Sequence, residues 1–166
     1  MKLTTFILSL SIIGSSLLAK EFQLQNSDYY FSYDQTKWEQ LDLGADTDDL
    51  WGFTDRLLYL DAGLMALDYL DDVESVLDFM KEVLSDEKED VVFSEVHFET
   101  EKFLVHKMRW KENDKEMEMW FRLLEGKTLS ALVYTQAEST ELNQHKHLAL
   151  SFMKGLEQKA AIRKIL

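Results

Sequence analysis

The sequence predicts an α+β fold, in which an antiparallel β-sheet meander is covered by helices on both faces. The first observation is the order of the elements, which runs from strands through one helix and four more strands to a final helix. The second is the spacing of those four strands, because their connections of a few residues are too short for a parallel crossover. The third lies in residues 116–124, where apolar side chains alternate onto both faces and predict a sheet that is covered on both sides.

Residues 1–19 have the order of a secretory signal peptide. A single cation, Lys2, precedes an apolar run, and small residues lead to Ala19 before Lys20. The apolar run is shorter than the roughly 20 residues that a membrane-spanning helix needs. We therefore expect cleavage near Ala19–Lys20, a periplasmic or secreted location, one α+β domain over residues 20–166, and no stable membrane span after cleavage. A retained N-terminal anchor is the alternative.

The first elements of the mature chain are predicted to be strands. Residues 29–33 are rich in aromatic side chains and lie between two aspartates, which is typical of a strand bounded by turns. Residues 38–41 follow after a four-residue turn, so the two segments are expected to form a hairpin. The preceding residues 20–28 form either a lead-in or a short strand.

The next segment is harder to interpret. Residues 44–54 leave two alternatives open, a short helical turn capped by aspartates or a loop. Residues 57–60 and 64–70 predict two buried strands joined by a turn. A helix is the alternative there, because short apolar runs do not distinguish the two.

The second half of the chain is predicted more clearly. Residues 73–84 carry apolar side chains at helical spacing, and residues 139–159 predict a final helix with the same kind of stripe. Between them, four strands are expected at residues 91–98, 103–110, 116–124 and 128–135.

Composition and charge exclude several classes of protein. The chain has no Cys, so it has no disulfide, no thiol nucleophile and no cysteine-based zinc site. Its six glycines form neither a nucleophile elbow nor a phosphate-binding loop. The formal net charge of −13 disfavours nucleic acid and anionic membrane surfaces as partners. It suits a basic envelope protein or a cation instead.

The sequence also resembles the PsbP-like superfamily, which includes extrinsic photosystem II proteins and bacterial DcrB-like envelope proteins. An aromatic strand leads into Trp38, a capped helix follows the segment that begins at Leu64, and a meander ending in Thr135 precedes a helix that carries Ser151 and Phe152. The resemblance spans most of residues 28–158. It implies an αβα sandwich and a non-enzymatic binding or assembly role, and it transfers no catalytic residue and no cofactor.

Two histidines and one glutamate are the candidate metal ligands. If Phe98 lies opposite Phe103, then His97 and His106 share one face of the sheet and Glu95 lies across from His106. Imidazole and carboxylate together suit zinc or copper, although a third ligand is not evident. Ordinary strand histidines are therefore the favoured interpretation, and no metal or cofactor is predicted.

These observations favour an exported, non-enzymatic binding or envelope-assembly protein. Trp51 is the candidate for an exposed residue on a ligand or partner surface, because it lies beside a glycine in the segment that is hardest to interpret. Two alternatives remain, an exported metal-dependent hydrolase that uses the His/Glu strand cluster and a carrier that holds a small hydrophobic ligand between a helix and the sheet.

Overall fold

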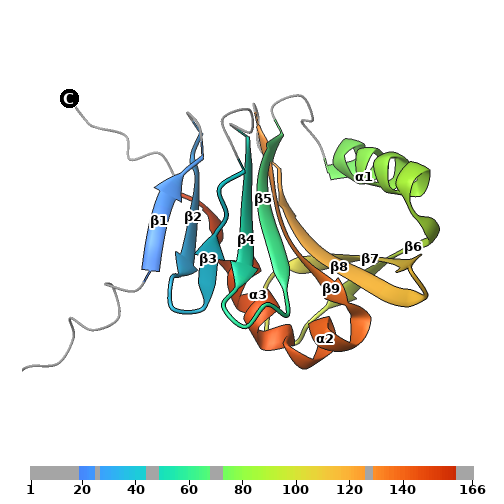
Figure 1. The fold of residues 1–166 in the computed structure, drawn as a ribbon. Coiled ribbons are helices and arrows are strands. Elements are labelled where there is room, and N and C mark those ends of the chain that lie inside the picture. The colour runs from blue at the N-terminus through green and yellow to red at the C-terminus, as the bar shows by residue number, and fades with distance from the viewer. Residues whose placement is uncertain (1–18, 25–26, 44–48, 68–72, 126–128, 160–166) are drawn as a thin grey trace, which may run out of the picture.

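The computed structural model describes residues 19–24, 27–43, 49–67, 73–125 and 129–159 (Figure 1). The predicted leader therefore lies outside the described residues, apart from Ala19. Among the described residues the chain forms a seven-stranded sheet, a three-stranded sheet and three helices. None of the helices described is long and apolar enough to span a bilayer.

The large sheet is antiparallel and has the order β3-β4-β5-β9-β8-β7-β6. Its strands are β3 (Trp38–Gln40), β4 (Leu50–Asp55), β5 (Asp61–Leu67), β6 (Glu89–His97), β7 (Leu104–Glu112), β8 (Lys115–Leu124) and β9 (Ser130–Glu138). The last four form the predicted meander. A two-residue turn joins β7 to β8, and both of its residues, Asn113 and Asp114, have positive φ, as the twist of such a hairpin requires.

The small sheet corrects the predicted N-terminal hairpin. Strand β2 (Tyr29–Asp34) pairs with β1 (Ala19–Gln23) and with β10 (Leu156–Gln158), whereas β3 pairs with β4 in the large sheet. The turn between β2 and β3 is present, and the Asp34 carboxylate accepts a hydrogen bond from the Thr36 amide at 2.9 Å. The chain then crosses into the other sheet, because Trp38 packs into the core, where its ring centroid lies 4.3 Å from that of Phe152.

Two further expectations for the first half were wrong. Residues 50–55 form strand β4 and not a helical turn or a loop. The backbone between β4 and β5 turns at residues 56–60, so residues 57–60 are no buried strand. Leu60 alone is buried there, and Leu57 and Leu58 are exposed.

The helices lie on opposite faces of the large sheet (Figure 1). Helix α1 (Val73–Glu87) packs against one face through Val76 and Met80. The predicted final helix is interrupted at His145, which separates α2 (Ser139–Gln144) from α3 (Lys146–Lys154). Helix α3 ends at Lys154, five residues before the predicted end at residue 159, and the chain continues as β10.

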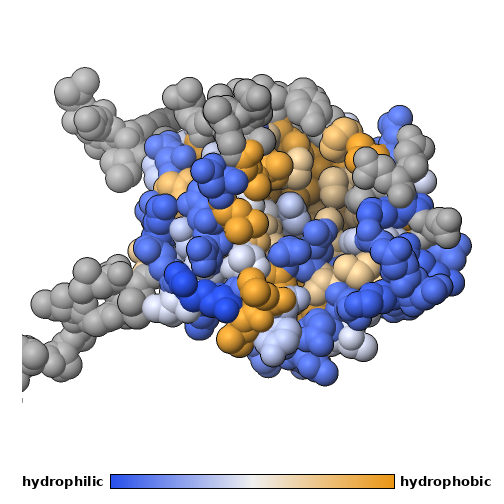
Figure 2. Space-filling model, in the orientation of Figure 1, coloured by the Kyte–Doolittle hydropathy of each residue, from blue (hydrophilic) through white to orange (hydrophobic). Residues whose placement is uncertain are grey.

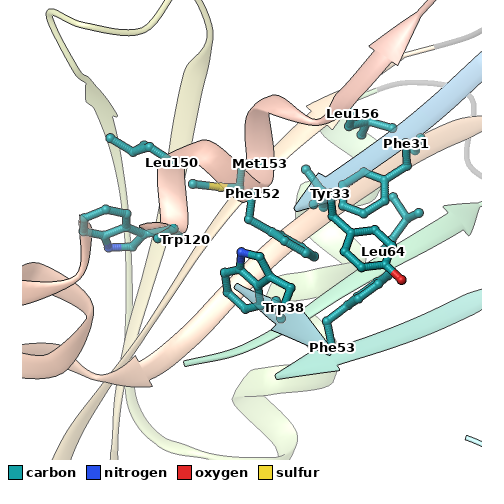
Figure 3. Packing of buried hydrophobic residues seen from close by; sticks show 14 of the residues in the cluster. Phe31, Tyr33, Trp38, Phe53, Leu64, Trp120, Leu150, Phe152, Met153 and Leu156 are labelled. Carbon is teal, nitrogen blue, oxygen red and sulfur yellow. The ribbon is translucent and has the colours of Figure 1, made fainter. Parts of the chain in front are cut away.

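The main core lies between the large sheet, the small sheet and helix α3 (Figure 3). Phe152 is at its centre, with ring centroids 5.0 Å from Phe31 and 5.1 Å from Phe53. Aromatic pairs at these distances add to the hydrophobic stabilisation of the burial itself. The small sheet and α3 thus cover one face of the large sheet, which leaves the other face to α1.

Candidate functional site: the α1 face of the large sheet

The face of the large sheet that carries α1, here called the α1 face, is crossed by a continuous row of residues from β4 to β6. Each member of this row lies directly opposite the next member on the neighbouring strand. In order, the row is Gly52, Gly63, Tyr134, Phe121, His106 and Glu95. It runs from small residues through aromatic ones to a histidine–carboxylate pair.

At the glycine end of the row, Gly63 leaves room for the ring of Tyr134. A Cβ atom on Gly63 would lie 2.3 Å from the Tyr134 ring, so only glycine accommodates the ring in this position. Leu43 covers Gly52 in a similar way, with its nearest atom 3.0 Å from where a Cβ would be. Burial raises the pKa of the Tyr134 hydroxyl, and the Asp61 carboxylate raises it further. The Tyr134 phenol is therefore uncharged at neutral pH.

The surface beside Tyr134 is apolar and only partly covered. Met65, Leu123 and Tyr134 are half-buried, whereas Met108 and Phe121, nearer to α1, are buried. Figure 2 shows apolar side chains in the hollow between β5 and α1. The α1 face therefore has a closed part beneath the helix and a more open part over β5 and β9.

Glu95 and His106 meet at the other end of the row, and the register of β6 and β7 is the predicted one. His106 Nδ1 lies 3.4 Å from a Glu95 carboxylate oxygen, and the imidazole stacks on Phe121 with centroids 5.2 Å apart. A pocket of about 180 Å³ lies here between α1 and the edge of the sheet. It is lined by Leu77, Lys81, Phe93, Ser94, Glu95 and His106.

Burial lowers the pKa of His106, and the Glu95 carboxylate opposes that shift only in part. The imidazole is therefore neutral at pH 7, and we expect it to titrate below its ordinary value of 6.5. An NMR titration of the ring protons tests this directly. Glu95→Gln should lower the midpoint further, because it removes the carboxylate that favours the charged imidazolium. A midpoint above 6.5 in the unmodified protein would contradict this assignment.

The two other predicted residues are His97, which the register of β6 and β7 places on the same face as this pair, and Trp51. His97 is exposed on β6 and lies opposite Leu104. Within the ranges that the structure describes, no three histidine, aspartate or glutamate side chains are placed to hold a metal ion. The metal-dependent hydrolase thus stays a prediction, which metal analysis of the purified protein and of its His106→Ala variant tests. Trp51 is half-buried, not exposed, and its ring centroid lies 5.5 Å from that of Phe22.

The opposite face holds a buried ionic cluster that was not predicted. The Glu118 side chain is buried and accepts hydrogen bonds from Trp120 Nε1 and from Ser139 Oγ, the latter at 2.9 Å. Lys107 Nζ lies 2.9 Å from the carboxylate and 4.5 Å from the Trp120 ring centre. A sequence signal existed, because Glu118 is two residues from Trp120 and so shares its buried face. The cluster ties the start of α2 to β7 and β8.

Burial acts to raise the pKa of Glu118, but hydrogen bonds from Trp120, Lys107 and Ser139 outweigh it and hold the pKa below the ordinary value of 4.5. The carboxylate is ionised at neutral pH and each of its bonds is charge-assisted. This cluster holds the start of α2 against the sheet and so has a structural role. The accessible apolar surface lies on the α1 face.

The fold is that of the PsbP-like class, an α+β architecture with helices on both faces of an antiparallel sheet. The solution structure of cyanobacterial PsbP (CyanoP) from Synechocystis sp. PCC 6803 is similar over 90% of this chain and 98% of its own, with a TM-score of 0.56 at 10% identity. The Saccharomyces cerevisiae Ran-binding protein Mog1p is similar over 84% of this chain and 95% of its own, with a TM-score of 0.57 at 8% identity. The sequence matches no protein-family model and no curated protein. The likeness to these two proteins is therefore one of fold.

Proposed function

We propose that the protein is exported through residues 1–19 and acts as a non-enzymatic binding protein. Its α1 face receives a segment of a partner protein that carries apolar and basic side chains. The observation that carries this proposal is the open apolar surface around Met65, Leu123 and Tyr134. A contiguous apolar surface that is only partly covered in a folded domain is typical of an interaction site.

Charge supports a basic partner. Glu95 is exposed at one end of the row, Asp61 is exposed near Tyr134, and the whole chain has a net charge of −13. An apolar floor with an acidic margin favours a segment in which basic and apolar side chains alternate, because complementary charge speeds association and selects the partner. The similarity to Mog1p, described as a Ran-binding protein, supports a binding role for this fold. It does not identify the partner.

The binding proposal is tested by photo-crosslinking in the producing cell. A photoreactive phenylalanine analogue replaces Met65 on the open part of the α1 face, and a control replaces Lys102, which is exposed in the β6–β7 connection. We expect one discrete crosslinked protein from position 65 and none of that mass from position 102. Equal crosslinking from both positions, or none from position 65, would count against this surface.

Export is tested separately by cell fractionation and by the N-terminal sequence of the purified chain. The expected sequence starts at Lys20. Because Ala19 and Lys20 pair with Asp34 and Tyr33 in the folded protein, cleavage is expected before β1 adds to β2. A full-length chain that stays in the cytoplasm would exclude the exported role.

A small-ligand carrier is a second candidate, because of the pocket between α1 and strands β6 and β7. Its volume of about 180 Å³ is below the usual range of pockets for drug-sized ligands, so the ligand would be a small one. Leu77 and Phe93 would contact the apolar part of such a ligand, and His106 would contact a polar group. Native mass spectrometry distinguishes the two candidates. A carrier should co-purify with a small molecule, and the Leu77→Asp variant should lack that molecule.

A further inference from the structure

Strand β6 forms one border of the large sheet, and in the described part of the chain its outer side pairs with no other strand (Figure 1). In an antiparallel pair, only alternate residues direct their amide and carbonyl groups toward the neighbouring strand. The residues between them therefore direct these groups outward from β6. Pairing with β7 is regular from Val92 to His97, beyond the irregularity that follows Glu89. This border thus offers an extended row of backbone donors and acceptors.

The other borders of the two described sheets are much shorter. Strands β1, β3 and β10 have five, three and three residues, whereas β6 has nine. Borders in proteins are usually protected by short strands, by lysine or by proline, because free backbone groups pair readily with other chains. Strand β6 contains neither lysine nor proline, and Val92 at its border is 59% exposed. Of these four borders, β6 is therefore the one suited to pairing.

The pocket of about 180 Å³ described above lies beside this border, because three of its lining residues, Phe93, Ser94 and Glu95, belong to β6. Successive side chains of a strand point to opposite faces of its sheet. A further strand paired with β6 would therefore place every second side chain on the α1 face, next to Phe93 and Glu95. The pocket, which Leu77 of α1 also lines, has room for one of these side chains.

The charges at the border favour a basic side chain in that position. The Glu95 side chain is 59% exposed, and β6 itself contains neither lysine nor arginine. Lys81, the cation that lines the pocket, lies 3.2 Å from the Asp78 carboxylate and is already balanced. A basic residue directly opposite Glu95 forms a favourable cross-strand pair. On the other face of the sheet, Val92 and Val96 favour apolar neighbours.

A second copy of this chain fits the border poorly. Another β6 strand would offer Glu95 no lysine or arginine as a partner. Each copy also has a net charge of −13, so electrostatic repulsion opposes their association. The border instead suits a segment of another protein in which basic and apolar side chains alternate.

We propose that the outer side of β6 binds an extended segment of a partner protein, which adds to the sheet as a further strand and places a basic side chain against Glu95. Backbone pairing supplies affinity, and the pocket selects the side chain that enters it. In the order of the sheet, β6 lies four strand positions from β5. The proposal therefore does not depend on the open apolar surface around Met65.

The test measures amide hydrogen exchange by NMR in the purified protein, with an acetylated and amidated peptide in which lysine alternates with valine. We expect the peptide to slow the exchange of alternate amides between Val92 and His97, because these amides point outward from β6. Amides near Met65 should exchange as before. A control peptide carries N-methyl groups on two consecutive central residues, which removes a donor from each of its edges and keeps its charge. This control should protect no amide of β6.

Charge reversal tests the contact with Glu95. Glu95→Lys should weaken the binding of the unmethylated peptide about tenfold, because an attractive cross-strand pair becomes a repulsive one. Glu116→Lys is the matched control, since it changes the net charge equally and its side chain is 54% exposed on β8, away from the border. This variant should bind the peptide almost as well as the unmodified protein does.

Absence of protection on β6, equal protection by the N-methylated peptide, or an equal loss of affinity in the two variants would each overturn the proposal. Self-association of the chain that protects the same amides without any peptide would also overturn it, and would assign the border to a second copy. Protection near Met65 alone would exclude β6 as the site for the peptide and support the surface proposed above. The two proposals can therefore fail independently.

Discussion

Replacement of Glu118 by alanine is expected to lower the free energy of unfolding by about 3–5 kcal/mol, the usual cost of removing one partner from a buried ion pair. The substitution leaves Lys107 beneath the Trp120 ring without its carboxylate and removes the acceptor for Ser139 Oγ. Urea unfolding at pH 7 measures the change. Glu116→Ala is the matched control on the same strand, because the Glu116 side chain is 54% exposed and pairs with Arg109 at the surface.

The pH dependence of the same variant checks the cause. The pKa of Glu118 in the folded protein lies below 4.5, so its contribution to stability is complete at neutral pH and is lost as pH falls below that value. The difference in stability between the unmodified protein and Glu118→Ala should therefore shrink as the pH is lowered from about 4.5. A loss below about 1 kcal/mol at pH 7, comparable to that of an exposed pair, would show that the cluster does not fasten α2 to the sheet.

Gly155→Ala is expected to destabilise the protein by about 3 kcal/mol, at the upper end of the usual range for overpacking. A Cβ at this position would lie 1.9 Å from the carbonyl oxygen of Ser32, and a backbone atom that is paired in a sheet does not move aside easily. The Gly155 carbonyl also accepts a hydrogen bond from the Ser32 amide at 3.0 Å. The clash therefore acts where α3 meets the small sheet.

Gly52→Ala provides the comparison for that measurement. The three atoms nearest to its Cβ would all belong to the Leu43 side chain, which is exposed and can move, so we expect a change well below that of Gly155→Ala. Thermal unfolding of both variants gives the ranking. Equal melting temperatures for Gly155→Ala and the unmodified protein would contradict the close packing of α3 against β2.

The sequence predicted the second half of the fold well for a physical reason. The α1 stripe has a clear helical period, and the short connections between β6, β7, β8 and β9 leave only an antiparallel meander. The register that places Glu95 opposite His106 also follows from those connections. Strand pairing and local pattern agree here, so local reasoning is sufficient.

The first half depends on contacts that are distant in sequence. The turn after Asp34 is compatible with a hairpin, yet β2 pairs with β10, which lies more than a hundred residues further along. The apolar stripe of the final helix continues through His145 without a sign of the break, and Leu156 is buried although it lies in β10 and not in the helix. Only the completed core specifies these pairings.

The candidate site was predicted in part. The pair of Glu95 and His106 follows from the alternation of side chains along each strand and from the register of β6 and β7. The open apolar surface over β5 and β9 does not follow from either. It depends on Gly63, which accommodates the Tyr134 ring, and on α1 covering only one side of this face. The exposed turn at Leu57 and Leu58 was missed as well, because two leucines before a tyrosine resemble a buried strand.

The most direct test of the binding role is the affinity of the protein crosslinked from position 65 for purified variants of this chain. Met65→Asp places a charge on the open part of the α1 face, and Lys102→Asp is its control in the β6–β7 connection. Titration calorimetry should show at least a tenfold loss of affinity for Met65→Asp, which corresponds to about 1.4 kcal/mol, and little change for the control. Unchanged affinity in a folded Met65→Asp protein would show that the partner binds elsewhere.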